Sequence, residues 1–252
     1  MFFVFNKRKI NSYLISISTV VVLFGISMFV NNNSKLNSTI ETSTESISSL
    51  PIYKAETEIK KVAISINCSE NVENIESIID SLSKMKVKAT FYITGELAAK
   101  YPDKVKKIVN NGNEIGNLSY HYTNLKNKNK DEIKEEIENC TKEIEKITNI
   151  KVKTFRAPYG ECSNTITKEA KAQNLVTTQW NVDSLDYNGL NSEEMCERIN
   201  EGMIPGSIIL LHNNGKYTAD SIEDIIHNIQ KQEYNICTVS DLLGLQNSTK
   251  VN

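Results

Sequence analysis

From Lys61 onward, short β-branched runs alternate with charged helical segments, and this alternation restricts the possible folds more than any other feature of the sequence. Repeated strand–helix units imply parallel strands joined by right-handed crossovers. The runs predicted as strands are Val62–Ile66, Ala89–Thr94, Glu114–Leu118, Lys153–Arg156, Leu175–Val182, Ser207–Leu211 and Asn235–Val239. Helical periodicity is predicted over Val72–Met85, Asp131–Ile147, Ser192–Glu201 and Thr218–Gln232.

Both an open doubly wound sheet and a closed barrel are compatible with this alternation. An open dinucleotide-binding sheet usually carries a Gly-rich turn after its first strand. This chain has Asn67-Cys68-Ser69 at that point. The sequence therefore favours an α/β fold of the (β/α) barrel type, seven-stranded and irregular.

The first thirty residues differ from the rest of the chain. A basic cluster at residues 7–9 precedes an apolar run at residues 10–30, which is long enough as a helix to cross one hydrocarbon core. Basic residues before the run predict a cytoplasmic N-terminus (residues 1–9), a single transmembrane anchor (residues 10–30) and an extracytoplasmic domain. A cleaved signal peptide is the alternative, although Met28–Asn31 lacks a small-x-small cleavage site.

The remaining boundaries follow from composition. Residues 31–57 are rich in Asn, Ser, Thr and Glu and are predicted to form a flexible stalk, with packing onto the domain possible only near Leu50 to Tyr53. The folded domain is predicted to span residues 58–245, followed by a tail at residues 246–252. A formal net charge of −2 gives no field that would recruit nucleic acid. The sequence does not predict an oligomeric state.

The number and spacing of the five cysteines argue against a disulfide-stabilised fold and a zinc ribbon. An odd total without a CxxC pair is neither a disulfide framework nor a zinc ribbon. Most of them are therefore expected to be small buried apolar residues. They are Cys68, Cys140, Cys162, Cys196 and Cys237.

Polar side chains follow the predicted strands at their carboxyl ends, where the loops of a (β/α) barrel carry its chemistry. They come from five different strands, so the sequence predicts one polar pocket at that end of the barrel. The residues are Asn67 and Cys68, Tyr120 and His121, Arg156 to Gly160, Asp183 and Asp186, and His212.

Five ordered segments resemble the polysaccharide deacetylase family (NodB homology, carbohydrate esterase 4), and most closely its PdaB-like sporulation subgroup. The resemblance covers about residues 60–243 and implies a hydrolase that removes acetyl groups from N-acetylated sugar polymers with a divalent metal such as zinc. The segments are Lys88-Ala-Thr-Phe-Tyr-Ile-Thr-Gly95, Asn113-Glu-Ile-Gly-Asn117, Phe155-Arg-Ala-Pro-Tyr-Gly160, Trp180-Asn-Val-Asp-Ser-Leu-Asp186 and Pro205-Gly-Ser-Ile-Ile-Leu-Leu-His212.

The sequence departs from the family pattern at the residues that bind the metal. The resemblance implies a base and a metal-binding Asp where this chain has Asn67 and Cys68. It also implies two metal-binding His at the positions of Leu118 and Tyr122, with His121 one position out of register. An amide cannot act as a base near neutral pH, and a Leu cannot bind a metal. We therefore predict no metal site of the family type and doubtful metal-dependent activity.

Three other motifs of the family are retained. The resemblance implies that Arg156 braces the base, that the backbone N–H of Tyr159 helps to hold the oxyanion, and that His212 is a general acid kept charged by an Asp partner. Asp183 and Asp186 belong to the fourth motif. The resemblance assigns substrate contacts to Pro158, Tyr187 and Leu210.

The sequence thus predicts a membrane-anchored protein of the cell envelope that acts weakly on peptidoglycan or a related amino-sugar polymer, or binds it without turnover, with sporulation as the implied context. Two alternatives stay open. The barrel could be an inactive scaffold, or Cys68 and His121 could form a thiolate–imidazole pair with His212 as acid.

Overall fold

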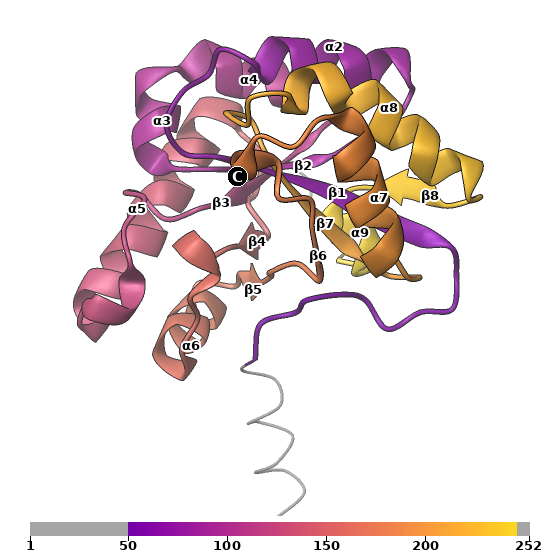
Figure 1. The fold of residues 1–252 in the computed structure, drawn as a ribbon. Helices are drawn as coiled ribbons and strands as arrows, with labels where there is room; N and C mark the ends of the chain where they lie inside the picture. Colours follow the sequence, from indigo (N-terminus) through magenta and orange to yellow (C-terminus); the bar gives the residue numbers. More distant parts are fainter. Residues whose placement is uncertain (1–49, 246–252) are drawn as a thin grey trace, which may run out of the picture. The chain divides into compact units, whose positions relative to one another are not determined.

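The computed structural model describes residues 50–245 (Figure 1). The predicted cytoplasmic N-terminus, transmembrane anchor and tail, and most of the predicted stalk, lie outside this range. Within it, no helix is both long and apolar enough to cross a bilayer. The strands are β1 (Lys61–Cys68), β2 (Thr90–Ile93), β3 (Glu114–Asn117), β4 (Thr154–Phe155), β5 (Val176–Thr177), β6 (Val182–Asp183), β7 (Ile208–His212) and β8 (Asn235–Cys237).

Four of the helices in the described range were not predicted from the periodicity, namely those at residues 95–100, 102–110, 164–172 and 239–242. The α-helices are α2 (Ile75–Lys84), α3 (Gly95–Lys100), α4 (Pro102–Asn110), α5 (Lys130–Thr148), α6 (Asn164–Ala172), α7 (Ser192–Gly202), α8 (Thr218–Lys231) and α9 (Val239–Leu242). Three 3₁₀ turns are η1 (Leu125–Asn127), η2 (Pro158–Gly160) and η3 (Asp186–Asn188).

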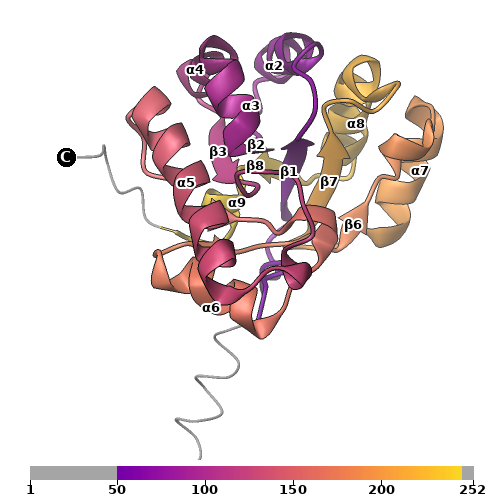
Figure 2. The ribbon, with the colours of Figure 1, turned by 90° about the vertical axis from the view of Figure 1, so that its left-hand side faces the viewer.

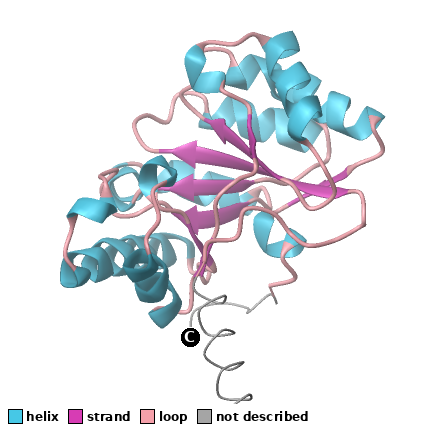
Figure 3. Ribbon diagram, turned by 60° about the horizontal axis from the view of Figure 1, so that its bottom comes forward, coloured by secondary structure: helices cyan, strands magenta, loops and turns pink. Residues whose placement is uncertain are grey.

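The strands form one curled parallel sheet in the order β5-β4-β3-β2-β1-β7-β6, with β8 also paired to β1. Figure 2 shows helices α2, α3, α4, α5, α7 and α8 in an arc around the strands, and Figure 3 shows the strands running side by side between helices. The predicted (β/α) architecture is confirmed. The prediction of a seven-stranded barrel is wrong, because eight strands form a half-barrel whose edge strands β5 and β6 do not pair.

The predicted strand Leu175–Val182 is in fact two strands at opposite edges of this sheet. The backbone N–H of Thr178 still donates to Phe155 on the β4 side, at 2.8 Å, whereas that of Asn181 donates to Ile208 on the β7 side, at 3.3 Å. The chain therefore crosses between the two edges over residues 178–181. One β-branched run was mistaken for one strand because hydrophobic pattern does not reveal which neighbour each residue pairs with.

Alternation along β1 separates the two sides of the sheet. Val62, Ile64, Ile66 and Cys68 belong to the large cluster under the helices, which includes the apolar faces of α2 and α8. The intervening Ala63 belongs to a second cluster inside the curled sheet. Because strand side chains alternate, Ser65 and Asn67 also face this interior. The interior of the half-barrel therefore contains polar groups close to the carboxyl end of β1.

Helix α5 is defined by strong signals at both ends. The Asn129 side chain accepts the backbone N–H groups of Asp131 and Glu132, and the Glu132 carboxylate accepts the N–H of Asn129, which completes a capping box. Asn149 ends the helix in the left-handed conformation. The observed helix extends the predicted Asp131–Ile147 by one residue at each end.

Residues just before β1 also belong to the folded domain. The N–H of Ile52 donates to Thr177, at 2.9 Å, and its carbonyl accepts the N–H of Gln179, at 2.7 Å. The N–H of Ala55 donates to Gly206, at 2.8 Å. The segment of residues 52–55 therefore joins the open edge at β5 to the turn before β7.

We predict that Gly206→Ala destabilises the domain by several kcal/mol. Gly206 has a φ of +84°, and an added Cβ would lie 2.1 Å from the carbonyl oxygen of Ala55. Gly189→Ala is the matched control, because Gly189 has a similar φ of +78° with no atom within 4 Å of the added Cβ. Urea unfolding of both variants measures the difference, and equal losses would show that residues 52–55 do not contribute through this contact.

Candidate functional site

The structure brings the predicted site residues to one end of the half-barrel, because the carboxyl ends of its parallel strands lie at one edge. β1 supplies Asn67, the turn after β4 supplies Arg156 and Tyr159, and β7 ends at His212. β6 and the following turn carry the two acidic residues of the fourth motif. Four predicted residues do not present accessible side chains at this site, namely Cys68, His121, Pro158 and Leu210.

Arg156 is the largest fully buried side chain of the domain. Its guanidinium donates from Nη1 to Asn67 Oδ1 and from Nη2 to both Ser65 Oγ and the carbonyl of Gln179, each at 3.0 Å. The guanidinium carbon also lies 4.0 Å from the centroid of the Tyr92 ring, a cation–π contact. Arg156 thus connects β1 to the segment that crosses between the sheet edges.

Within residues 50–245, no carboxylate is a hydrogen-bond partner of this guanidinium. Burial lowers the pKa of Arg156 to about 10. Its Nε is buried without a hydrogen-bond partner. The charge is therefore held by neutral oxygens and aromatic rings, an arrangement that is costly unless an anion is nearby.

His212 and Asp186 form a hydrogen-bonded pair at the end of β7. His212 Nδ1 lies 2.8 Å from Asp186 Oδ1, and the His212 backbone N–H donates to Asp186 Oδ2 at 2.6 Å. Thr218 Oγ1 donates to the same Oδ2 at 2.7 Å. The carboxylate is fully buried, and these contacts fix Nδ1 of the imidazole toward it. Asp186 is therefore the Asp partner that orients His212, with the imidazole's other nitrogen left for proton transfer.

Asp183, the other acidic residue of the fourth motif, has a structural role. Its Oδ1 accepts the N–H of Leu185 at 2.9 Å, and its Oδ2 accepts the Tyr187 hydroxyl at 3.2 Å. The Tyr187 ring meets the His212 ring edge to face, with centroids 5.3 Å apart. Asp183 therefore stabilises the turn that places Tyr187 beside the histidine.

His121 turns away from this site. Its Nδ1 lies 3.1 Å from Oε1 of Glu136 on α5, and its backbone N–H donates to Glu136 Oε2 at 2.8 Å. Ser119 Oγ and Lys128 Nζ contact the same carboxylate. Glu136 therefore anchors the loop after β3, and the side chain of His121 lines a cavity of about 230 Å³ beside α5.

The proposed thiolate–imidazole pair is not formed. The Cys68 side chain is fully buried in the cluster under the helices, where desolvation raises its pKa. Its Sγ donates to the carbonyl of Ile66, at 3.9 Å. A buried thiol with a raised pKa is a poor nucleophile, and β-strand alternation puts Cys68 on the face opposite to Asn67.

The two positions where the resemblance implies histidines are filled by apolar and aromatic side chains. Leu118 is fully buried in the interior cluster, and Tyr122 packs against that cluster. Burial raises the pKa of Tyr122, so its phenol stays protonated near neutral pH. Two substrate-contact predictions concern buried side chains: Leu210 is 1% exposed within β7, and Pro158 is buried at the start of η2.

The side chains present do not fit the divalent metal that the resemblance implies. Within residues 50–245, no three side chains of His, Cys, Asp or Glu come together as a possible ligand set. Asn67 already accepts from Arg156, and His212 Nδ1 is paired with Asp186. A site with one amide, one phenol and one imidazole lacks the carboxylate and histidine donors of a catalytic metal centre.

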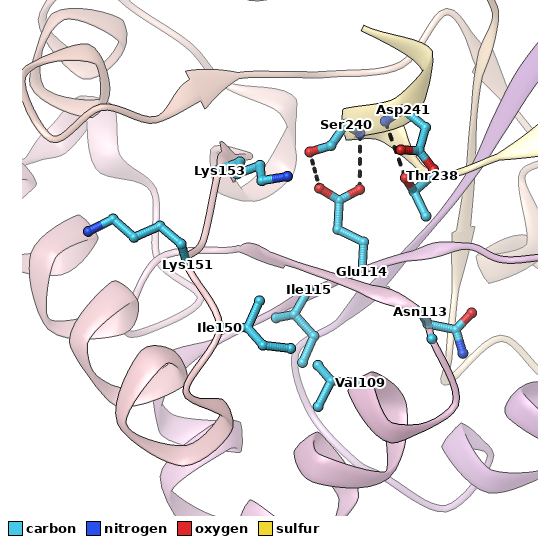
Figure 4. Close-up of a pocket in the computed structure, with 11 residues that line it drawn as sticks. Val109, Asn113, Glu114, Ile115, Ile150, Lys151, Lys153, Thr238, Ser240 and Asp241 are labelled. Atoms are coloured by element: carbon cyan, nitrogen blue, oxygen red, sulfur yellow. Dashed lines mark hydrogen bonds between the residues drawn. The ribbon is translucent and has the colours of Figure 1, made fainter. Parts of the chain in front are cut away.

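Sequence reasoning missed the supporting residues Glu136, Thr218, Gln179 and Tyr92. Glu136 is one of several glutamates on α5, and Gln179 acts through its carbonyl, so neither had a distinguishing signal. A cavity of about 240 Å³ at the amino ends of β3 and β4 was also unforeseen. Figure 4 shows Glu114 in this cavity, with its carboxylate joined to Ser240 of α9.

We predict that Asn67→Asp raises the free energy of unfolding by about 1 to 3 kcal/mol at pH 7, because it gives the buried Arg156 a counter-charge. Arg156 would hold the folded-state pKa of the new carboxyl below its unfolded value of about 3.9. The gain is therefore present above that value and is lost as the pH falls through the folded-state pKa. Urea unfolding at pH 7 and pH 3 measures it. Asn67→Leu, the uncharged control, should destabilise, and a loss from both variants would contradict the prediction.

We predict that Glu136→Gln lowers the free energy of unfolding by about 1 to 2 kcal/mol at pH 7. Burial of Glu136 alone would raise its pKa, but hydrogen bonds from His121, Ser119 and Lys128 lower it below 4.5. This stabilisation is present above pH 4.5 and is lost as the pH falls through the lowered folded-state pKa. The variant should therefore lose less stability on acidification than the parent. Glu135→Gln, on the exposed side of α5, is the control and should change little.

Comparisons with known proteins match most of the described domain. A model of the polysaccharide deacetylase family matches residues 54–178. The peptidoglycan-N-acetylglucosamine deacetylase of Bacillus cereus is 30% identical over 204 residues, which cover 79% of this chain and 72% of that protein. The peptidoglycan-N-acetylmuramic acid deacetylase PdaA of Bacillus subtilis is 31% identical over 171 residues, which cover 66% of this chain and 65% of PdaA.

Solved structures give the same assignment. A wild-type CE4 family pseudoenzyme from Bacillus anthracis has a TM-score of 0.75 at 30% identity, covering 78% of this chain and 69% of that one. A mutant of that pseudoenzyme, described as having restored enzymatic activity, has the same TM-score and identity. The match covers 78% of this chain and 72% of the mutant chain. The order of the strands, the buried Arg156 and the His212–Asp186 pair are thus found in a chain that belongs to the polysaccharide deacetylase (carbohydrate esterase 4) family.

Proposed function

We propose that this protein binds acetylated amino-sugar polymers of the cell wall at the carboxyl end of its half-barrel without metal-dependent deacetylation. The observation that carries the proposal is the chemistry of the four positions where the resemblance implies a base and metal ligands. The side-chain oxygen of Asn67 accepts a hydrogen bond from Arg156, and the Cys68 side chain faces the helices. Leu118 and Tyr122 pack in the interior cluster. None of them supplies a base or a set of metal ligands.

Amide hydrolysis needs a water activated for attack and a stabilised oxyanion. The donor for proton transfer survives, because Asp186 orients His212. The group that would remove a proton from water does not, since Asn67 has no basic atom. The retained half of the site can therefore position and protonate a sugar amide, and slow turnover at most is the chemical consequence.

The names of similar proteins support both the ligand and the loss of activity. Two relatives are named as deacetylases of peptidoglycan N-acetylglucosamine or N-acetylmuramic acid. One solved neighbour is a CE4 family pseudoenzyme. We extend the proposal to an extracytoplasmic domain held at the membrane by residues 10–30, with a role in the envelope of a sporulating cell, on the sequence alone.

We predict that a hexamer of β-1,4-linked N-acetylglucosamine at about ten times its Kd stabilises the full-length protein by about 1.4 kcal/mol. This gain corresponds to an increase of about 3 to 6 °C in Tm. We expect no acetate release above background with added zinc, cobalt or manganese. The Bacillus cereus deacetylase, assayed in parallel, is the positive control.

Two outcomes would overturn the proposal in different ways. Turnover that a chelator abolishes would mean that a metal site forms from these residues after all. Absence of a thermal shift, together with wild-type function in cells for His212→Ala, would instead identify the barrel as an inactive scaffold.

A further inference from the structure

An aromatic pair, Tyr122 and Tyr159, lies at the rim of the half-barrel. Tyr122 follows β3 and Tyr159 lies in the η2 turn after β4, so two separate loops contribute the rings. Their centroids are 4.6 Å apart, with 50° between the ring planes. Tyr159 is 58% exposed, the most exposed tyrosine of the described range, whereas Tyr122 is half-buried. The pair therefore has one ring on the protein surface and one ring that supports it.

One hydrogen bond and the backbone of the η2 turn restrict the position of the exposed ring. The Tyr159 hydroxyl donates to the backbone carbonyl of Tyr122, at 3.1 Å. The Tyr159 backbone has a φ of +58°, an unusual conformation for a residue with a Cβ, which the following Gly160 continues at +71°. The Trp180 ring lies against Gly160, since a Cβ there would be 2.9 Å from it. Tyr159 is thus fixed before any ligand arrives, which reduces the entropy lost on binding.

The supporting ring is equally well anchored. Tyr122 packs against the interior cluster that contains Leu118 and Tyr92. With a phenol that stays protonated, it brings no negative charge to the rim. A surface tyrosine of this kind exposes an apolar face that a ligand can cover.

Charges of both signs lie around the pair. Arg156 and Glu70 both act electrostatically on Tyr122, and Glu161 directly follows the η2 turn. The nearby Lys126 is paired with Glu161 at 3.6 Å. A neutral ligand with an apolar face therefore fits this surface better than a phosphate-rich polymer. A pyranose ring has such a face, formed by its axial C–H groups.

We propose that Tyr159, supported by Tyr122, is a stacking platform for a pyranose ring of the bound glycan. This inference rests on the proposed function and names how the same end of the barrel holds its ligand. Of the two rings, Tyr122 stands at a position where the resemblance implies a metal-binding histidine, whereas Tyr159 belongs to a retained motif. At the position of Tyr122, support for the platform thus takes the place of a metal ligand.

The test is titration of the full-length protein with the N-acetylglucosamine hexamer, followed by calorimetry and by the fluorescence of Trp180, the only tryptophan of the chain. Tyr159→Leu should weaken binding by about fivefold to tenfold, because stacking on an aromatic ring is lost. Tyr159→Phe keeps the ring and loses only the hydroxyl anchor, so it should weaken binding by about twofold to threefold. Tyr122→Leu should resemble Tyr159→Leu.

Tyr53→Leu is the matched control, since Tyr53 is 49% exposed and lies before β1. It should bind like the parent. If the parent binds the hexamer and Tyr159→Leu and Tyr122→Leu bind equally well with unchanged Tm, the platform is wrong while the proposed function stands. If the parent does not bind, the proposed function fails and the platform with it. Should the Leu variants unfold, NMR saturation transfer from the Tyr159 ring protons of the parent to the bound hexamer decides, and its absence overturns the platform.

Discussion

The buried guanidinium of Arg156 organises the interior of the half-barrel. It leaves the end of β4, reaches two side chains of β1, and bonds the carbonyl of Gln179 in the segment that crosses between the sheet edges. It is the largest of the fully buried side chains in the described residues. Because a buried cation must find partners, the polar residues Ser65 and Asn67 are required on a strand that is otherwise apolar. Arg156 thereby connects β1, the end of β4 and the crossing segment.

The chemistry of the site is divided between a preserved half and a replaced half. The preserved half is the His212–Asp186 pair, held by Thr218 and flanked by Tyr187. The replaced half lies across β1 and β3, where an amide, a leucine and a tyrosine complete the packing. This division accounts for a family fold with good structural agreement and a poor set of metal ligands. Recognition of a sugar and hydrolysis of its amide are separable properties, and the binding proposed above requires only the first.

The sequence predicted what depends on local pattern. Alternating strands and helices gave the (β/α) architecture, and the strand-end residues Asn67, Arg156 and His212 do lie at one edge. The sequence did not predict which strands pair with each other. The run Leu175–Val182 reads as one strand, yet its two ends pair with β4 and β7 on opposite sides of the opening.

The sequence also did not predict which way the side chains of Cys68 and His121 point. Cys68 and Asn67 are neighbours along β1, but only the second faces the interior. His121 lies after β3, at the same edge of the sheet as the site residues, but a hydrogen bond to Glu136 holds its side chain toward α5. A glutamate on a helix rich in glutamates carries no signal of such a role, so the loop position could not be foreseen.

The docking of residues 52–55 has a mechanical consequence. These residues bond both to the β5 edge and to the turn before β7, across the unpaired side of the sheet. Any force that reaches the domain through the preceding chain is therefore applied first to the hydrogen bonds of Ile52 and Ala55. Detaching them would leave the unpaired seam between β5 and β6 uncovered and let the curled sheet widen along it.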